Sequence, residues 1–186
     1  MSLADELQRV AGLAVDAVSA PEGDVVSGVI PTEPAAGRRV YLCAFDDADG
    51  YRSWVGVRED GSLVESRDEL REAVSIAALC EVATDAAGGG DLDTLIARLE
   101  ELRRTEAPEG IVDAEEAARA LRDVVGESPQ VASPARLDAI GAATRRLERE
   151  LDPTGPSPFS AAMQSSQGAV GELQREIEAG YRLPLA

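Results

Sequence analysis

Two strand-like segments joined by a short acidic turn limit the folds available to this chain. Arg39 to Phe45 and Tyr51 to Val57 are rich in aromatic and β-branched residues, as strands usually are. The Asp47-Ala48-Asp49-Gly50 sequence between them is typical of a turn. Because so short a connection cannot form a parallel crossover, the two segments are expected to make an antiparallel hairpin.

Flanking segments extend this hairpin into a predicted antiparallel meander of about four strands. Val25 to Ile30 is rich in β-branched residues, and Pro31 to Gly37 reads as the loop that follows it. Leu63-Val64 reads as a short last strand, after a turn at Glu59 to Gly61.

Helical patterns lie on both sides of the meander. Apolar residues recur at three-to-four spacing over residues 3–18, which predicts an amphipathic helix. Ser66 and Glu69 have the spacing of a capping box, so a second helix is expected from Ser66 to about Ala87. The run Gly88-Gly89-Gly90 then ends that helix and is the best candidate for a boundary.

The remainder of the chain is predicted to be helical. Asp113, with Glu116 three residues later, predicts a helix start, and prolines 134 and 158 each stand in a predicted first turn. An apolar seam precedes these helices, formed by Leu92, Leu95, Ile96, Leu99 and Leu102.

The expected fold is therefore α+β. It comprises an N-terminal helix and an antiparallel meander packed on a long helix (residues 1–88), followed by an antiparallel helical half (residues 89–186) packed with them as one globular unit. The order helix, strands, helix at the start resembles the plan of small acidic secretion chaperones, although the long helical half departs from that plan.

The composition excludes much of the usual catalytic chemistry. The sequence contains no histidine, lysine or asparagine, so all eighteen of its basic side chains are arginine. Histidine-dependent catalytic pairs, lysine Schiff bases and the usual zinc sites are therefore excluded, and no cofactor is expected. A net charge of −17 disfavours binding to nucleic acid and to anionic membranes.

One face of the hairpin is the main candidate binding surface. If Asp47 to Gly50 is a four-residue loop, alternation places three arginines, three aromatic residues and a cysteine on one face of the sheet. These residues are Arg39, Tyr41, Cys43, Phe45, Arg52, Trp54 and Arg58. Three interpretations stay open: a face covered by a helix, a homodimer interface, or a groove for an anionic or peptide ligand.

Two sets of acidic residues are candidates for binding a divalent cation. Glu69, Glu72, Glu81 and Asp85 resemble the magnesium ligands of the all-helical nucleotide pyrophosphohydrolases, but the second pair is spaced by four residues, where that family has three. One helix cannot direct all four side chains at one metal, which favours a solvated helix face. The Asp46 to Gly50 loop fails both ends of a calcium-loop pattern and is read as a turn, with a weak divalent-ion site as the alternative.

These patterns predict a non-enzymatic, acidic, cytoplasmic interaction protein with a protein partner, possessing an adaptor, chaperone-like or regulatory role and self-associating, for instance as a homodimer. The alternative is a carboxylate-based, magnesium-dependent hydrolase acting on a nucleotide or phosphoester.

Overall fold

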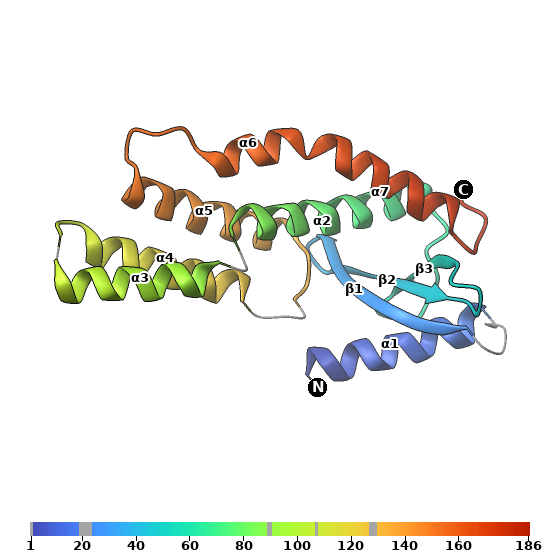
Figure 1. Ribbon diagram of the computed structural model, residues 1–186. Coiled ribbons are helices and arrows are strands. Elements are labelled where there is room, and N and C mark those ends of the chain that lie inside the picture. Colours follow the sequence, from blue (N-terminus) through green and yellow to red (C-terminus); the bar gives the residue numbers. More distant parts are fainter. Residues whose placement is uncertain (1, 19–23, 89–90, 107, 127–129) are drawn as a thin grey trace. The chain divides into compact units, whose positions relative to one another are not determined.

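The computed structural model describes residues 2–18, 24–88, 91–106, 108–126 and 130–186. These residues form an α+β structure with a three-stranded antiparallel sheet in the order β1-β2-β3 (Figure 1). The predicted fold class is therefore confirmed, whereas the sheet has three strands and not four. Gly89 and Gly90 of the predicted boundary lie outside the described residues.

The chain divides into two compact units, which are described separately. The first unit comprises Met1–Ala78, Pro129–Pro134 and Gly168–Ala186, and the second comprises Leu79–Ser128 and Ala135–Gln167. This division differs from the expected one at residues 88 and 89. Its first boundary lies inside helix α2 (Arg67–Ala86), and the last helix, α7 (Gln167–Ala179), belongs largely to the first unit.

The sheet of the first unit contains β1 (Val25–Ala35), β2 (Arg38–Asp46) and β3 (Arg52–Arg58). The predicted loop at Pro31 to Gly37 is wrong over most of its length, because β1 continues to Ala35. The sheet accepts Pro31 because that residue lies in an edge strand, where a missing N–H group breaks no bond to β2. The predicted fourth strand is reduced to one isolated bridge between Leu63 and Val57.

Helix α1 (Leu3–Val18), which the periodicity predicted, packs on one face of this sheet. Its apolar stripe supplies the fully buried residues Val10 and Ala14. They form one core with the inward-facing residues of β2 and β3, namely Tyr41, Cys43, Phe45, Val55 and Val57. Burial of these aromatic and branched side chains is the main force that holds α1 to the sheet.

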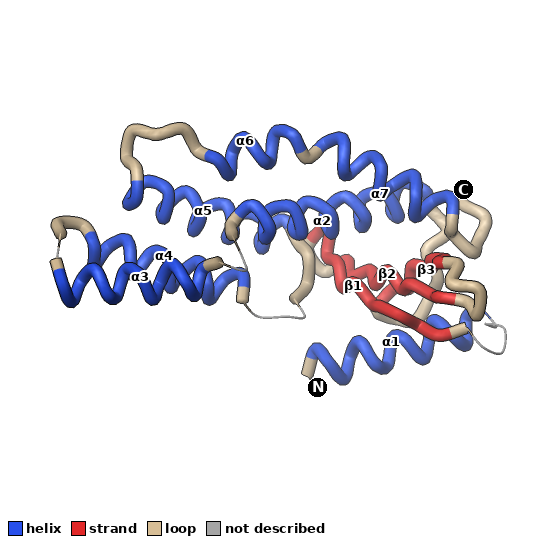
Figure 2. Tube along the Cα trace, in the orientation of Figure 1, coloured by secondary structure: helices blue, strands red, loops and turns tan. Residues whose placement is uncertain are grey.

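The first half of α2, together with α7, covers the opposite face of the sheet (Figure 2). The Glu69 amide donates a hydrogen bond to the Ser66 hydroxyl at 3.4 Å, so Ser66 caps the helix as predicted. The reciprocal half of the predicted capping box is absent from the described contacts, because the Glu69 carboxylate binds Arg58. Arg71 pairs with Glu178 and thereby joins α2 to α7.

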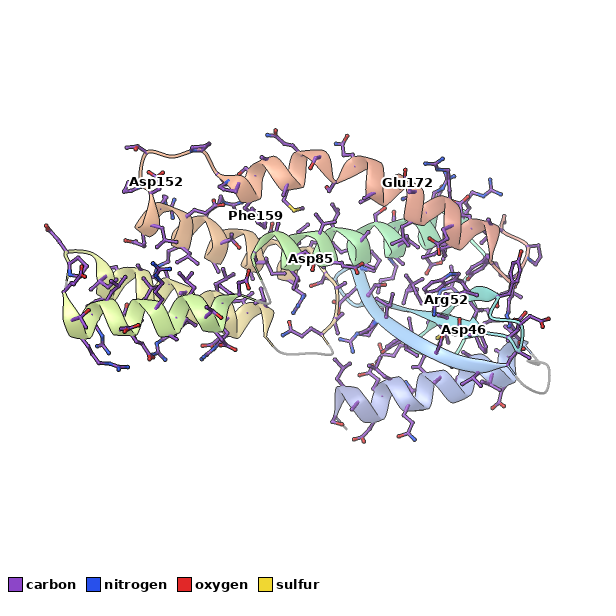
Figure 3. The ribbon with its side chains drawn as sticks, in the orientation of Figure 1. Asp46, Arg52, Asp85, Asp152, Phe159 and Glu172 are labelled. Atoms are coloured by element: carbon purple, nitrogen blue, oxygen red, sulfur yellow. The ribbon has the colours of Figure 1, made fainter. Side chains whose placement is uncertain are left out.

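The second unit is helical. It contains the end of α2 with α3 (Leu92–Thr105), α4 (Ile111–Val125), α5 (Pro134–Leu151) and α6 (Pro158–Ser165). The predicted seam is largely confirmed, since Leu92, Ile96 and Leu99 are buried in the core of this unit. The core also receives the Phe159 ring, labelled in Figure 3.

Two predicted helix boundaries in this part of the chain need correction. The start of α4 is at Ile111, after Gly110 with a φ of 81°, so Asp113 lies in the first turn and is not the cap. The single last helix predicted from Pro158 is divided at Ser166, whose hydroxyl donates to the carbonyl of Met163 at 2.7 Å. Hydrogen bonds of this kind compete with the helical backbone pattern.

Candidate functional site

The loop between β2 and β3 contains five residues, Asp47 to Tyr51, because Asp46 pairs directly with Arg52. The four-residue loop assumed from the sequence is therefore wrong. A shift of one residue moves every β3 side chain to the opposite face of the sheet. The proposed surface is consequently divided: Arg39, Tyr41, Cys43 and Phe45 share one face, while Arg52, Trp54 and Arg58 lie on the other.

The aromatic residues on the first face are covered by α1. Tyr41, Cys43 and Phe45 have no exposed surface. Burial also raises the pKa of the Cys43 thiol to about 12, so its nucleophilic thiolate form is suppressed at neutral pH. Of the three interpretations of this face, the covered one describes the arrangement seen here.

A polar cluster joins α1 to this face. The Tyr41 hydroxyl donates to the Glu6 carboxylate, and the Arg39 guanidinium donates to the same carboxylate at 3.0 Å. The hydrogen bond from Tyr41 holds the pKa of Glu6 below its usual value. Burial, with the hydrogen bond to Glu6, raises the pKa of Tyr41 to about 12. Both groups therefore keep one protonation state near neutrality, which suits a contact that holds α1 to the sheet.

The residues on the second face are also engaged. Trp54 is 8% exposed and lies against Gly180, near the C-terminal end of the described chain. Arg52 makes a two-point contact with the Asp46 carboxylate at 2.8 and 3.0 Å, and Figure 3 shows these side chains close together at the end of the hairpin. Hydrogen bonding to Arg52 lowers the pKa of Asp46.

The carboxylates considered as magnesium ligands are not gathered in one place. Glu69 accepts two hydrogen bonds from Arg58, at 2.9 and 2.6 Å, and this guanidinium lowers the pKa of Glu69. Glu72 pairs with Arg38, while Glu81 and Asp85 are exposed in the other unit. Among the described residues, no three cysteine, aspartate or glutamate side chains are placed to hold a metal ion.

The acidic loop behaves as a turn. One oxygen of Asp47 accepts hydrogen bonds from the amides of Asp49 and Tyr51, at 2.9 and 2.8 Å. Gly50 has a φ of 81°, a conformation that few other residues adopt readily. Asp47 and Gly50 therefore have a local structural role in shaping the hairpin end.

The outer edge of β3 is paired with two segments. The sequence predicted Leu63-Val64 as part of the sheet but gave no indication of the other segment, at residues 180–182. The Trp54 amide donates to the Gly180 carbonyl at 2.9 Å, and the Arg182 amide donates to the Trp54 carbonyl at 3.0 Å. Farther along, the amide of Val64 donates to the carbonyl of Gly56 at 2.9 Å. Residues 180–182 and 62–64 thereby close this edge.

The side chains of this last segment anchor it to the sheet. The Tyr181 hydroxyl accepts from the Gly56 amide at 2.8 Å and donates to the Val64 carbonyl at 2.7 Å. The Arg182 guanidinium lies 4.4 Å from the centroid of the Phe45 ring and also pairs with Asp24. The aromatic residue at 181 was the only available sequence signal, and no local pattern connects it with β3.

A second charge cluster lies in the helical unit. Glu115, whose side chain is 9% exposed, contacts Arg103 and Arg119, each at 3.0 Å. Arg119 also contacts Glu100, so the cluster joins α3 to α4. Here too, the arginines neutralise carboxylates of the same chain.

None of the described helices combines the length and the apolar character needed to cross a membrane. No family model matches this chain, and comparisons with curated proteins and with solved structures find no significant match.

Proposed function

We propose that this protein is a non-enzymatic binding protein whose partner is another protein with a basic surface. The observation that supports this proposal is that most of the chain's positive charges are paired with its own acidic side chains. Arginine is the only basic side chain, and within the described residues at least eleven of the eighteen arginines are in ion pairs with acids of the same chain. These are Arg38, Arg39, Arg52, Arg58, Arg71, Arg103, Arg104, Arg119, Arg122, Arg146 and Arg182.

Ion pairs within the chain do not change its net charge of −17, so the excess of acidic side chains is not neutralised. A field of this sign attracts a basic protein surface, speeds its approach and repels phosphate-bearing ligands. It also opposes close contact between two copies of the chain, so a basic partner suits the charge better than a homodimer does. Self-association stays a prediction that light scattering can test.

Recovery and reconstitution of the partner test this proposal. The immobilised full chain is incubated with extract from its own cells, bound proteins are eluted with a salt gradient, and each is then purified. We expect a basic protein whose isolated complex weakens by about tenfold or more between about 0.05 M and about 0.3 M salt, because screening shortens the reach of the charges. A reconstituted complex that is insensitive to salt contradicts the proposal.

A separate measurement tests the hydrolase alternative. Thermal unfolding is followed with and without magnesium, and in the presence of nucleotides. A magnesium-dependent rise in Tm that disappears in Glu69→Gln would favour the hydrolase. We expect no such rise, because Arg58 already occupies both oxygens of the Glu69 carboxylate.

A further inference from the structure

The outer edge of β1 has backbone groups available for pairing. Pro31 and Glu33 direct their outward backbone groups to Ala132, through bonds of 2.9 Å to the Pro31 carbonyl and 2.7 Å from the Glu33 amide. Because outward and inward groups alternate along a strand, the Val29 amide and carbonyl also point outward. No hydrogen bond joins the Val29 backbone to another residue along this outer edge within the described chain.

Ile30, the residue after Val29, provides an internal reference for the direction of the Val29 backbone groups. Ile30 pairs with Leu42 of β2. On the far side of β2, Leu42 is opposite Gly56, whose own backbone groups point away toward Tyr181 and Val64. The Leu42 backbone therefore faces β1, and the Ile30 amide points inward to it.

Two apolar side chains at this edge stay partly exposed on the face of the sheet that α2 and α7 cover. Val25 is 64% exposed and Ile30 is 37% exposed. With the β-bulge between Val26 and Gly28, alternation puts Val25, Gly28 and Ile30 on the same face of β1. A Cβ atom added to Gly28 would meet nothing within 4 Å, so the space directly above Gly28 on this face of the sheet is open. An added strand could pack its side chains there.

Negative charge adjoins one end of this edge. Val25 pairs with Asp46, so the Val25 end lies beside the hairpin loop that carries Asp47 and Asp49. Asp49 is exposed. A basic side chain on an added strand would therefore find complementary charge at this end.

From these observations we propose that the Val26–Ile30 edge of β1 binds an extended, lysine- or arginine-bearing segment of the partner protein as an additional β-strand. Backbone pairing would supply affinity, and side chains beside Val25 and Ile30 would supply selectivity. An extended chain is the occupant that matches the outward-pointing amide and carbonyl groups of Val29 on an edge strand. The inference rests on the proposed function, because it locates the site at which the basic partner binds.

Hydrogen exchange in the free protein tests the first premise. We expect the Val29 amide to exchange much faster than the Ile30 amide, because only the latter points to β2. Equal and strong protection of both amides would show that the edge is already occupied and would overturn the proposal.

A synthetic peptide of alternating lysine and valine then serves as the probe, with NMR shifts of the backbone amides as the measurement. We expect shifts concentrated at Val26 to Ile30, and new protection of the Val29 amide. Two further peptides carry N-methyl groups on the lysines or on the valines. If the peptide binds as an added strand, one of these two N-methylated peptides should lose binding and the other should keep it. If simple charge attraction holds the peptide, both should bind alike.

Matched protein variants complete the test. Ile30→Lys places a positive charge beside the basic peptide and should weaken its binding about tenfold or more. Val112→Lys makes the same change of net charge on α4, where Val112 is 51% exposed, and should leave edge binding nearly intact. Equal weakening by the two variants would overturn the edge assignment.

The outcomes separate this inference from the proposed function. Salt-dependent peptide binding with shifts away from β1, and with no preference between the N-methylated peptides, overturns the edge site while supporting a basic partner. Failure of the peptide to bind even at low salt also overturns the edge site. In that case the salt dependence of the reconstituted partner complex, described above, decides whether the proposed function is correct.

Discussion

The hydroxyl group of Tyr181 occupies the space beside Gly56, although 125 residues separate the two positions. A Cβ atom at residue 56 would lie 2.9 Å from this hydroxyl oxygen and 3.0 Å from the Cβ of Val64. The glycine thus permits the hydrogen bonds by which Tyr181 closes the edge of β3. This contact is one of several that join the C-terminal segment to the first unit.

Gly56→Ala is expected to destabilise the first unit by about 1–3 kcal/mol, because a tightly packed site must accept an additional methyl group. Tyr181→Phe is expected to cost about 1–3 kcal/mol, since a buried amide and carbonyl lose their partner. Urea unfolding of both single variants and the double variant measures these costs. Removal of the hydroxyl relieves part of the clash, so Gly56→Ala should cost less in the Tyr181→Phe background. Strict additivity would contradict this contact.

Glu69→Gln is expected to cost about 1–3 kcal/mol at neutral pH, because Arg58 loses a charged partner that is mostly buried. Arg58 lowers the pKa of Glu69, so the stabilising effect is present above the usual glutamate pKa and is lost as pH falls through the lowered value. The loss of stability on acidification should therefore be smaller in Glu69→Gln. Urea unfolding between about pH 7 and about pH 3 measures this difference.

Glu72→Gln provides the matched control for this ion pair. Glu72 and Arg38 are 52% and 46% exposed, and such surface pairs contribute at most about 1 kcal/mol. A larger effect for Glu72→Gln than for Glu69→Gln would contradict the assigned importance of the Arg58–Glu69 contact.

Tyr41→Phe should change the response to alkali. Burial raises the pKa of Tyr41 to about 12, so above pH 10 the unfolded chain loses the phenol proton first. Stability from this group is full below pH 10 and falls as pH rises to about 12, by roughly 2–3 kcal/mol. Tyr41→Phe should be less stable at neutral pH, because Glu6 loses a donor, yet show a shallower decline with alkali. Equal slopes for the two proteins would contradict the buried hydrogen bond.

Sequence periodicity was sufficient for several elements but not for the candidate surface. Helix α1 and the cores of β2 and β3 depend on local patterns, which is why their positions were predicted. The register of the hairpin depends on whether Tyr51 belongs to the loop, and that one residue decides which face Trp54 occupies. Pairing of Tyr181 with β3 is a long-range contact that periodicity cannot reveal.

Cys43 is expected to be inert in the folded protein. In a Cys80→Ala variant it is the remaining thiol, and burial raises its pKa to about 12. Reaction with a thiol reagent at about pH 8 should be orders of magnitude slower than for a free thiol, and should follow the unfolding equilibrium as urea is added. Rapid stoichiometric labelling without urea would show that α1 leaves the sheet readily.

Deletion of residues 180–186 should uncover the outer edge of β3. Trp54 would lose both backbone partners, and its ring, 8% exposed in the intact chain, would lose the cover of Gly180. We expect a red-shifted tryptophan emission and concentration-dependent association by light scattering, since an unpaired edge favours pairing between chains. Deletion of residues 183–186 alone retains Gly180, Tyr181 and Arg182 and should shift the emission much less. Identical spectra for the intact chain and the longer deletion would show that this segment does not cover Trp54 in solution.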